Sequence, residues 1–133
     1  MKIGYYVTKI LPSLGLAAAL GLGIMQAPAH AWDKTDTLLQ GAYMATHITD
    51  WGQTRSISES CNSDGRYYET NLVMGTCPSM QTVNLYFIGT GLLHVGVAHT
   101  LPKKYRRMFQ LGTLGMQINY ISNNQQLGLK VSF

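Results

Sequence analysis

Charged residues are scarce in this chain: Asp, Glu, Lys and Arg make up only 12% of its 133 residues. Ten basic and six acidic residues give a formal charge of +4. Removal of the N-terminal Lys2 and Lys9 would leave eight basic against six acidic residues, a balance of +2. A nucleic-acid-binding surface needs a dense basic stripe, which this composition excludes. The length allows at most one domain.

Acidic residues are absent from the N-terminal segment before Asp33. There, two lysines precede the apolar run "ILPSLGLAAALGLGIM", and the small-residue sequence "AHA" follows at 29–31. This pattern predicts a secretory signal peptide over residues 1–31, cleaved before Trp32, with an uncleaved anchor as the alternative. The mature domain would then comprise residues 32–133.

Cysteine is limited to Cys61 and Cys77. An even number of cysteines in an exported chain favours a disulfide, and closing a loop of this size would stabilise the fold by roughly 3 kcal/mol. Two separate thiols are the alternative. A zinc site is disfavoured because no ligand pair of zinc spacing lies nearby.

Charge is missing altogether from residues 82–101, "TVNLYFIGTGLLHVGVAHTL". Twenty helical residues match the thickness of a bilayer core, so this segment is predicted to be a transmembrane helix that ends at Pro102. Two further membrane-associated helices are predicted at about 37–58 and 105–124, with a loop over 59–79.

The predicted fold class is therefore all-α: a small helical membrane protein with two or three membrane-associated helices and a short extended C-terminal tail. The ending "QLGLKVSF" alternates apolar and polar residues, as the last strand of a small outer-membrane β-barrel does. Such a barrel is a further alternative.

The basic cluster "KKYRR" at residues 103–107 is predicted to face the cytoplasm. If the first helix spans the membrane fully, residues 59–79 lie in the cytoplasm and the basic cluster lies outside, against the positive-inside rule. If the first helix only dips into the periplasmic face, which we prefer, the cysteine loop and the C-terminus lie outside, where a disulfide can form. This arrangement indicates the bacterial cell envelope, with the inner membrane as the location and the lipid bilayer as a partner. Gly-rich helix faces would suit a membrane-protein partner or self-association.

The segment "MATHITDWGQTR" (44–55) concentrates polar groups in one predicted helix. Helical spacing places Tyr43, His47, Asp50, Thr54 and Ile57 on a single face, which must then contact protein or water rather than hydrocarbon. Arg55 lies off this face, where its side chain could reach lipid headgroups.

Three ionisable residues form the candidate site. If the second helix packs on the first, His94 would meet Asp50, and Glu69 from the loop would fold over them. Such a cluster could bind a divalent metal or perform acid–base catalysis. The spacing matches no catalytic motif, so structural ion pairing is preferred and no cofactor is predicted. The structural polar residues accompanying the cluster are predicted to be His47, Thr54, Asn71 and Asn84.

A bis-histidine haem would use His47 with His94 or His99, but it needs a wide pocket between helices and is not favoured. No CxxCH haem-attachment motif, serine nucleophile elbow or phosphate-binding glycine loop is present.

The fragments "DWGQTR", "YYETN", "GTCPS", "VNLYF" and "LPKKYRR" resemble a group of small bacterial and phage-borne helical membrane proteins of uncharacterised function. In that pattern a D-x-x-x-T helix precedes an E-x-N-P loop. Asp50 and Thr54 match the helix, Glu69 and Asn71 match the loop, and Leu72 replaces the proline. The resemblance covers residues 36–124 and implies a helical membrane fold without an activity.

These observations predict an exported membrane protein that serves as a structural or accessory component of an envelope complex and is not an enzyme. The alternative is a membrane metalloprotein or hydrolase that uses Asp50, Glu69 and His94.

Overall fold

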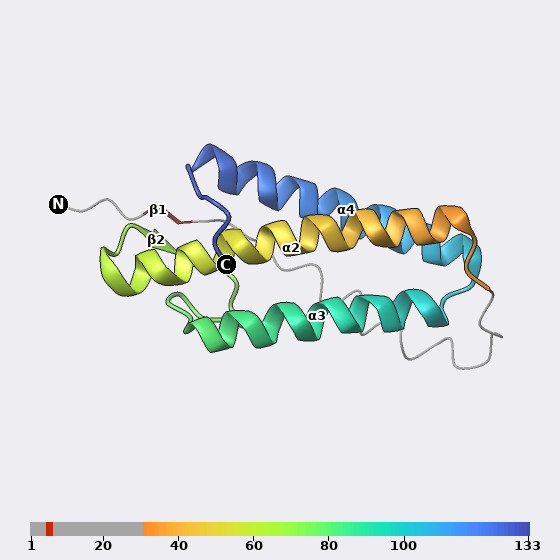
Figure 1. Ribbon diagram of the computed structural model, residues 1–133, viewed down its shortest axis with the longest axis horizontal. Helices are drawn as coiled ribbons and strands as arrows, with labels where there is room; N and C mark the ends of the chain where they lie inside the picture. The colour runs from red at the N-terminus through yellow and green to blue at the C-terminus, as the bar shows by residue number, and fades with distance from the viewer. Residues whose placement is uncertain (1–4, 7–30) are drawn as a thin grey trace.

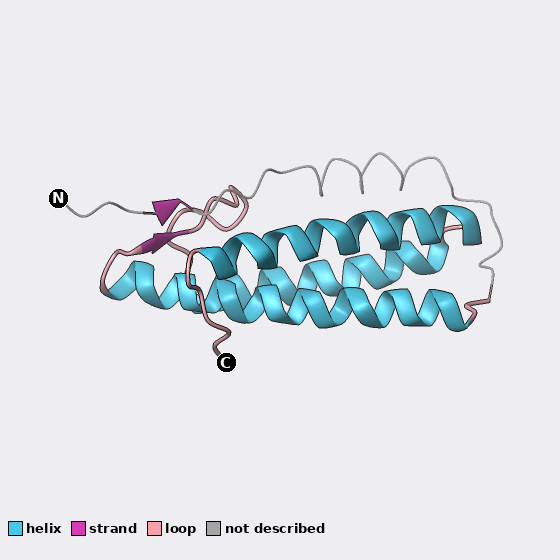
Figure 2. Cartoon of the chain, turned by 90° about the horizontal axis from the view of Figure 1, so that it is seen from above, coloured by secondary structure: helices cyan, strands magenta, loops and turns pink. Residues whose placement is uncertain are grey.

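The computed structural model describes residues 5–6 and 31–133. Its elements are β1 (Tyr5–Tyr6), α2 (Lys34–Ser63), β2 (Tyr67–Tyr68), α3 (Met80–Thr100) and α4 (Lys103–Gln126). The three helices lie side by side along the long axis of the molecule (Figure 1), and the two short strands pair in parallel at one end (Figure 2). The predicted all-α class is confirmed for these residues. Apart from β1 and residue 31, the predicted signal peptide lies outside the described residues.

The helix ends follow from local chemistry. Asp33 and Asp36 form a reciprocal capping box at the start of α2, and the Ser79 hydroxyl accepts a hydrogen bond from the backbone N–H of Thr82 at the start of α3. Pro102 separates α3 from α4, because a proline disfavours helical geometry in the residue before it. All three predicted helices are present, but α2 is longer than expected. The residues 59–63, which we assigned to the loop, form its last turn.

The predicted transmembrane span is not supported. Within residues 5–6 and 31–133, no helix is both long enough and apolar enough to cross a membrane. For α3, which covers the charge-free segment, the polar residues Asn84 and His94 contribute to this result by lowering the average hydropathy of the helix.

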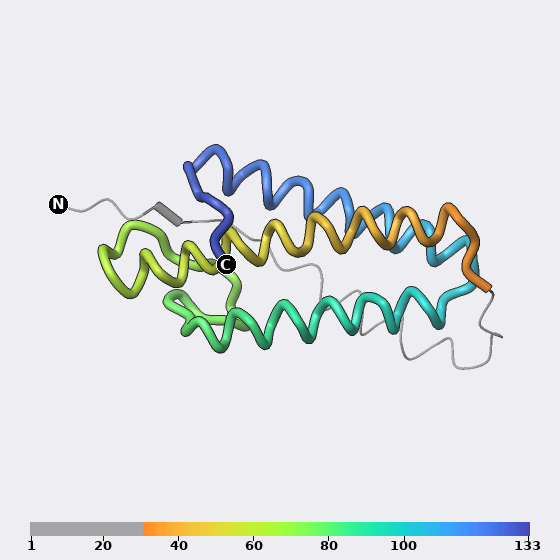
Figure 3. Tube along the Cα trace, in the orientation of Figure 1, coloured from red at the N-terminus to blue at the C-terminus, as the bar shows by residue number. Residues whose placement is uncertain are grey.

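Side-chain contacts define the relative direction of the helices. The pairs Asp36–Arg106, Gln40–Gln110 and His47–Gln117 each join α2 to α4 across a separation of 70 residues. A constant separation means that these two helices run parallel and in register. The chain reverses between α2 and α3 and again at Pro102, so α3 runs antiparallel to both, as the colour gradient of the tube shows (Figure 3).

The C-terminal tail packs against α2. Gly128, with φ of 78°, allows the backbone N–H groups of Gly128 and Leu129 to bond the carbonyls of Gln125 and Asn124, a Schellman motif. Leu129 then packs on Ile57 of α2. Beyond the motif the chain is irregular, so the all-β interpretation of this ending is wrong: its apolar residues contact a helix instead of forming a strand.

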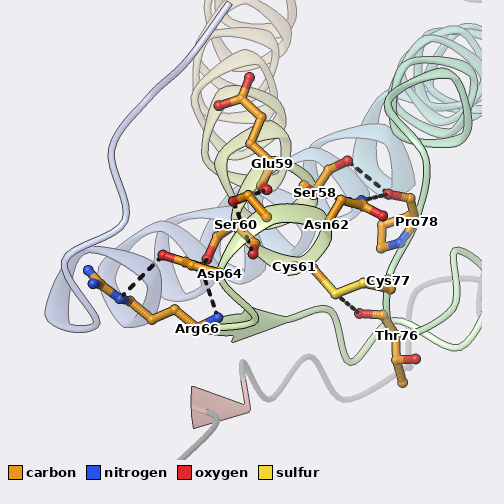
Figure 4. The surroundings of a disulfide bond; sticks show 11 residues. Ser58, Glu59, Ser60, Cys61, Asn62, Asp64, Arg66, Thr76, Cys77 and Pro78 are labelled. Atoms are coloured by element: carbon orange, nitrogen blue, oxygen red, sulfur yellow. Dashed lines mark hydrogen bonds and ion pairs between the residues drawn. A yellow bond between two sulfur atoms is a disulfide. The ribbon is translucent and has the colours of Figure 1, made fainter. Parts of the chain in front are cut away.

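The predicted disulfide is confirmed. Cys61, in the last turn of α2, bonds to Cys77 just before α3, with the two Cα atoms 5.7 Å apart. The Ser58 hydroxyl donates to the carbonyl of Pro78 at 2.8 Å beside it (Figure 4). The end of α2 is therefore fastened to the start of α3.

The predicted separation of the basic cluster from the start of the first helix is wrong, while the side of a membrane that the cluster faces stays a prediction. We placed "KKYRR" on the opposite side of a bilayer from the start of the mature chain. Arg107 instead contacts Asp33 at 2.6 Å and Asp36 at 2.9 Å, at the start of α2. Because the parallel packing brings the two helix starts together, both segments lie at the same end of the bundle.

Gly52→Ala should destabilise the protein by about 1–3 kcal/mol, because a Cβ at Gly52 would overlap Val131 and come within 3.0 Å of Phe133. Gly89→Ala on α3 is the control: nothing lies within 4 Å of its Cβ position, so helix propensity should raise stability by up to about 1 kcal/mol. Urea unfolding of both variants measures the difference, and equal effects would contradict the close packing of the tail.

Candidate functional site

The interior of the bundle is predominantly polar. Of the described residues, fourteen polar or charged ones are buried, against eight hydrophobic ones. Tyr43, His47, Asp50, Thr54 and Ile57 are all buried, as their predicted common face requires. The contacts of these side chains show what the interior can do chemically.

An ion cluster closes the end of the bundle at which α2 and α4 begin. Arg106 and Asp36 are both fully buried and form a salt bridge of 2.9 Å, while Arg107 binds Asp36 from the other side. The Arg106 side chain also donates to the carbonyls of Ala98 and Leu101. Burial opposes ionisation of Asp36. The hydrogen bonds that its carboxylate accepts from Arg107, from the backbone N–H of Asp33 and from Arg106 outweigh this effect and hold the pKa of the carboxyl below the usual range. The cluster is built to fix helices rather than to exchange protons.

His94 is held by a directional chain of hydrogen bonds. The Gln110 amide donates to the carbonyl of Asp36, at 3.1 Å, and to Oε1 of Gln40, at 3.2 Å. Gln40 therefore presents its Nε2 to Nδ1 of His94, 3.1 Å away, and this nitrogen must accept. The remaining Nε2–H of His94 donates to the Thr113 hydroxyl at 2.8 Å. The chain selects one tautomer of a neutral imidazole.

Burial, with a smaller contribution from His47, lowers the pKa of His94 to about 3. The ring lies against Tyr43, with centroids 3.4 Å apart, and Phe109 covers it at 4.5 Å. Burial also raises the pKa of Tyr43 to about 12. Neither group is therefore poised to transfer a proton near neutral pH.

His47 repeats the arrangement half-way along α2. Its Nε2–H donates to the carbonyl of Phe87 at 2.9 Å, so its Nδ1 accepts from the Gln117 amide at 3.0 Å. Both nitrogens of His47, like both of His94, form hydrogen bonds within the protein. Neither ring presents a nitrogen to a metal or haem iron in this arrangement.

Asp50 pairs with Asn124 of α4. The amide of Asn124 donates both to Oδ1 of Asp50, at 3.2 Å, and to Oε1 of Gln53, at 3.1 Å. Asp50 lies ten residues after Gln40, the partner of His94, which is about 15 Å further along the helix. The proposed meeting of Asp50 and His94 is therefore wrong. The prediction considered only the packing of α3 on α2 and left out α4, which supplies the partner of Asp50.

Glu69 and Asn71 shape the loop from within. The fully buried Glu69 accepts hydrogen bonds from the backbone N–H groups of Thr70 and Asn71, both at 2.9 Å, and the Asn71 side chain accepts one from Val73. Met74 then packs on α3. The two matched residues of the E-x-N pattern thus stabilise a turn, and Leu72 at the position of the missing proline is exposed.

Asn84 and Arg55 also find partners inside the protein. The Asn84 side-chain oxygen accepts from Nε1 of Trp51 at 3.0 Å and from Nη1 of Arg55 at 2.8 Å. Because only Nη1 of Arg55 is used in this contact, the predicted reach of its side chain toward headgroups stays a prediction.

The candidate cluster is not assembled as predicted. Among residues 5–6 and 31–133, no group of three His, Cys, Asp or Glu side chains is arranged to hold a metal ion. The chain matches no protein-family model, and comparisons with curated proteins and with solved structures find no match.

The polar residues on the α4 side of the interior were not predicted from the sequence. Gln110, Gln117 and Asn124 are buried, follow one another at seven-residue intervals, and all donate to polar groups of α2. That spacing is visible in the sequence and matches the spacing of Gln40 and His47. It would have indicated a parallel polar seam between the two helices.

A double-mutant cycle between Asp50→Ala and Asn124→Ala should give a coupling energy of at least about 0.5 kcal/mol in urea unfolding, because the residues share a buried hydrogen bond. A cycle between Asp50→Ala and His94→Gln should be additive to within about 0.5 kcal/mol. Coupling in the second cycle and not in the first would contradict the observed pairing.

Stability should fall as the pH is lowered from 6.5 toward 3. The folded-state pKa of His94, about 3, lies below its ordinary value of 6.5, so the unfolded chain binds a proton that the folded protein does not. The maximal slope from one such group is about 1.4 kcal/mol per pH unit. His94→Gln should reduce the slope in denaturation measured at stepwise pH, and an unchanged slope would contradict this cause.

Proposed function

We propose that the protein is an exported, non-enzymatic component of the bacterial cell envelope that associates with a lipid bilayer through its apolar exterior. In this role it is a structural or accessory part of an envelope membrane complex. The observation that carries the proposal is the inverted distribution of polarity between the interior and the surface of the bundle.

Large apolar side chains are exposed on all three helices. The exposed apolar residues of α3 are Leu85, Ile88, Leu92, Leu93 and Val95, and those of α4 include Met108, Leu111 and Ile118. A protein surrounded by water seldom exposes so many apolar side chains over adjacent helices. Acyl chains would accept this surface, while the buried polar groups bind one another.

The charges support the same surroundings. The helix α3 carries no charged residue, and α4 carries none after Arg107. Between Asp36 and Arg55, the only charged residue of α2 is Asp50, which is buried. The middle of the bundle therefore has no exposed charge to remove from water when it contacts lipid.

The buried polar residues favour a structural role over catalysis. His94, the strongest candidate for acid–base chemistry, donates to Thr113 and accepts from Gln40. Its lowered pKa removes it further from the range of a general base at neutral pH. The disulfide between Cys61 and Cys77 supports export, because such bonds persist in oxidising compartments.

The purified full-length protein should bind neutral phosphatidylcholine vesicles in a flotation assay. Leu85→Gln combined with Leu92→Gln should weaken binding at least roughly tenfold, because both exposed side chains contribute apolar area. Gln81→Ala, also exposed on α3, is the control and should bind as the unchanged protein does. An unchanged protein that does not float with vesicles would overturn the proposal.

A further inference from the structure

Arg55 differs from the other arginines of the described chain. Arg66, Arg106 and Arg107 each form a salt bridge with an aspartate. Arg55 has no carboxylate partner among residues 5–6 and 31–133, and its hydrogen bond goes to the neutral side chain of Asn84. Its positive charge is therefore uncompensated by any described residue.

The guanidinium of Arg55 is held in a defined orientation. Nη1 donates to Oδ1 of Asn84, and this oxygen is itself fixed by the indole N–H of Trp51. The ring of Phe133 lies beside the guanidinium carbon, 5.9 Å from it. Nε of Arg55 is buried without a hydrogen-bond partner among the described residues. Nε itself is enclosed, so an external acceptor could reach only the terminal Nη groups of the guanidinium.

The surrounding elements supply no anion for Arg55. Glu59, one turn further along α2, accepts a hydrogen bond from the Ser132 hydroxyl of the tail instead. The facing helix α3 contains no charged residue, and the tail has a single charged side chain, the cationic Lys130. Neither these side chains nor the α-carboxylate of Phe133 forms an ion pair with Arg55 among the described residues, so an external anion can bind there.

We propose that Arg55, oriented by Asn84, binds the phosphate of an anionic phospholipid. A guanidinium fork matches phosphate oxygens in shape and charge. The source is a lipid headgroup because apolar side chains flank the cation: Val131 is 50% exposed and Phe133 is 70% exposed. A cation next to exposed aromatic and aliphatic groups suits the boundary between headgroups and acyl chains. This inference rests on the proposed association with a bilayer.

Vesicle flotation with and without phosphatidylglycerol tests the site in the full-length protein. Replacing part of the phosphatidylcholine by phosphatidylglycerol should strengthen binding of the unchanged protein, and Arg55→Gln should weaken binding to the mixed vesicles about fivefold. The matched control is Arg66→Gln, which removes the same charge from an exposed arginine paired with Asp64 and should keep the gain. Equal losses in both variants would indicate general charge attraction and overturn the site.

Arg55→Lys covers the case in which Arg55→Gln does not fold, which circular dichroism would show. The lysine keeps the charge but not the planar fork, so the gain from phosphatidylglycerol should fall here too, and full retention would overturn the phosphate site. The emission of Trp51, measured in a Trp32→Phe background, reports on the same Asn84 contact. It should change with phosphatidylglycerol in detergent micelles and not with inorganic phosphate.

An Arg55-dependent response to inorganic phosphate alone would overturn the lipid as the source. Binding to neutral vesicles without any gain from phosphatidylglycerol would overturn the inference and leave the proposed function standing. Failure to bind either kind of vesicle would overturn both.

Discussion

A hydrogen-bonding amide inside a helical bundle needs complementary groups, and in this protein the side-chain N–H donors of Gln110, Gln117 and Asn124 on α4 find theirs on α2. The side-chain oxygens of the same three residues are buried without a hydrogen-bond partner among the described residues. Gln40 and His47 on α2 face Gln110 and Gln117 on α4, and α3 supplies His94 and the carbonyl of Phe87. Because unpaired polar groups in an interior cost about 1–3 kcal/mol each, this requirement fixes how the helices pack. Because polar side chains occupy the interior, apolar side chains lie on the exterior and the exposed charges lie toward the ends of the bundle.

The ends of the bundle are fixed by different means. At one end the ion pair of Asp36 and Arg106 is completely buried, and breaking such a pair strands a charge in the interior. At the other end a disulfide and the turn around Glu69 connect α2 to α3, and the Schellman motif directs the tail back over α2. Both ends thereby restrict sliding of the helices past one another. The polar layers between the ends oppose the same movement.

Much of the fold could be predicted from the sequence, and the candidate site could not. The three helices and the disulfide follow from the capping residues, Pro102 and the number of cysteines, which are local signals. The common face of His47 and Asp50 also follows, because helical periodicity is local. The pairing of Asp50 with Asn124 depends on packing between residues 74 positions apart. The seven-residue spacing on α4 indicates a polar seam but does not say which residues meet across it.

The constant offset between α2 and α4 leaves their alignment ambiguous at the layers of Gln40 and His47. Moving α4 by one seven-residue repeat would place Gln117 opposite Gln40 and Asn124 opposite His47, so carboxamides would still face polar partners. The same shift would place the neutral Thr113 opposite Asp36 and remove Arg106 from it. The shift would also leave no residue of α4 opposite the buried Asp50, which now pairs with Asn124. The two buried aspartates of α2, Asp36 and Asp50, therefore distinguish the native alignment from this competitor.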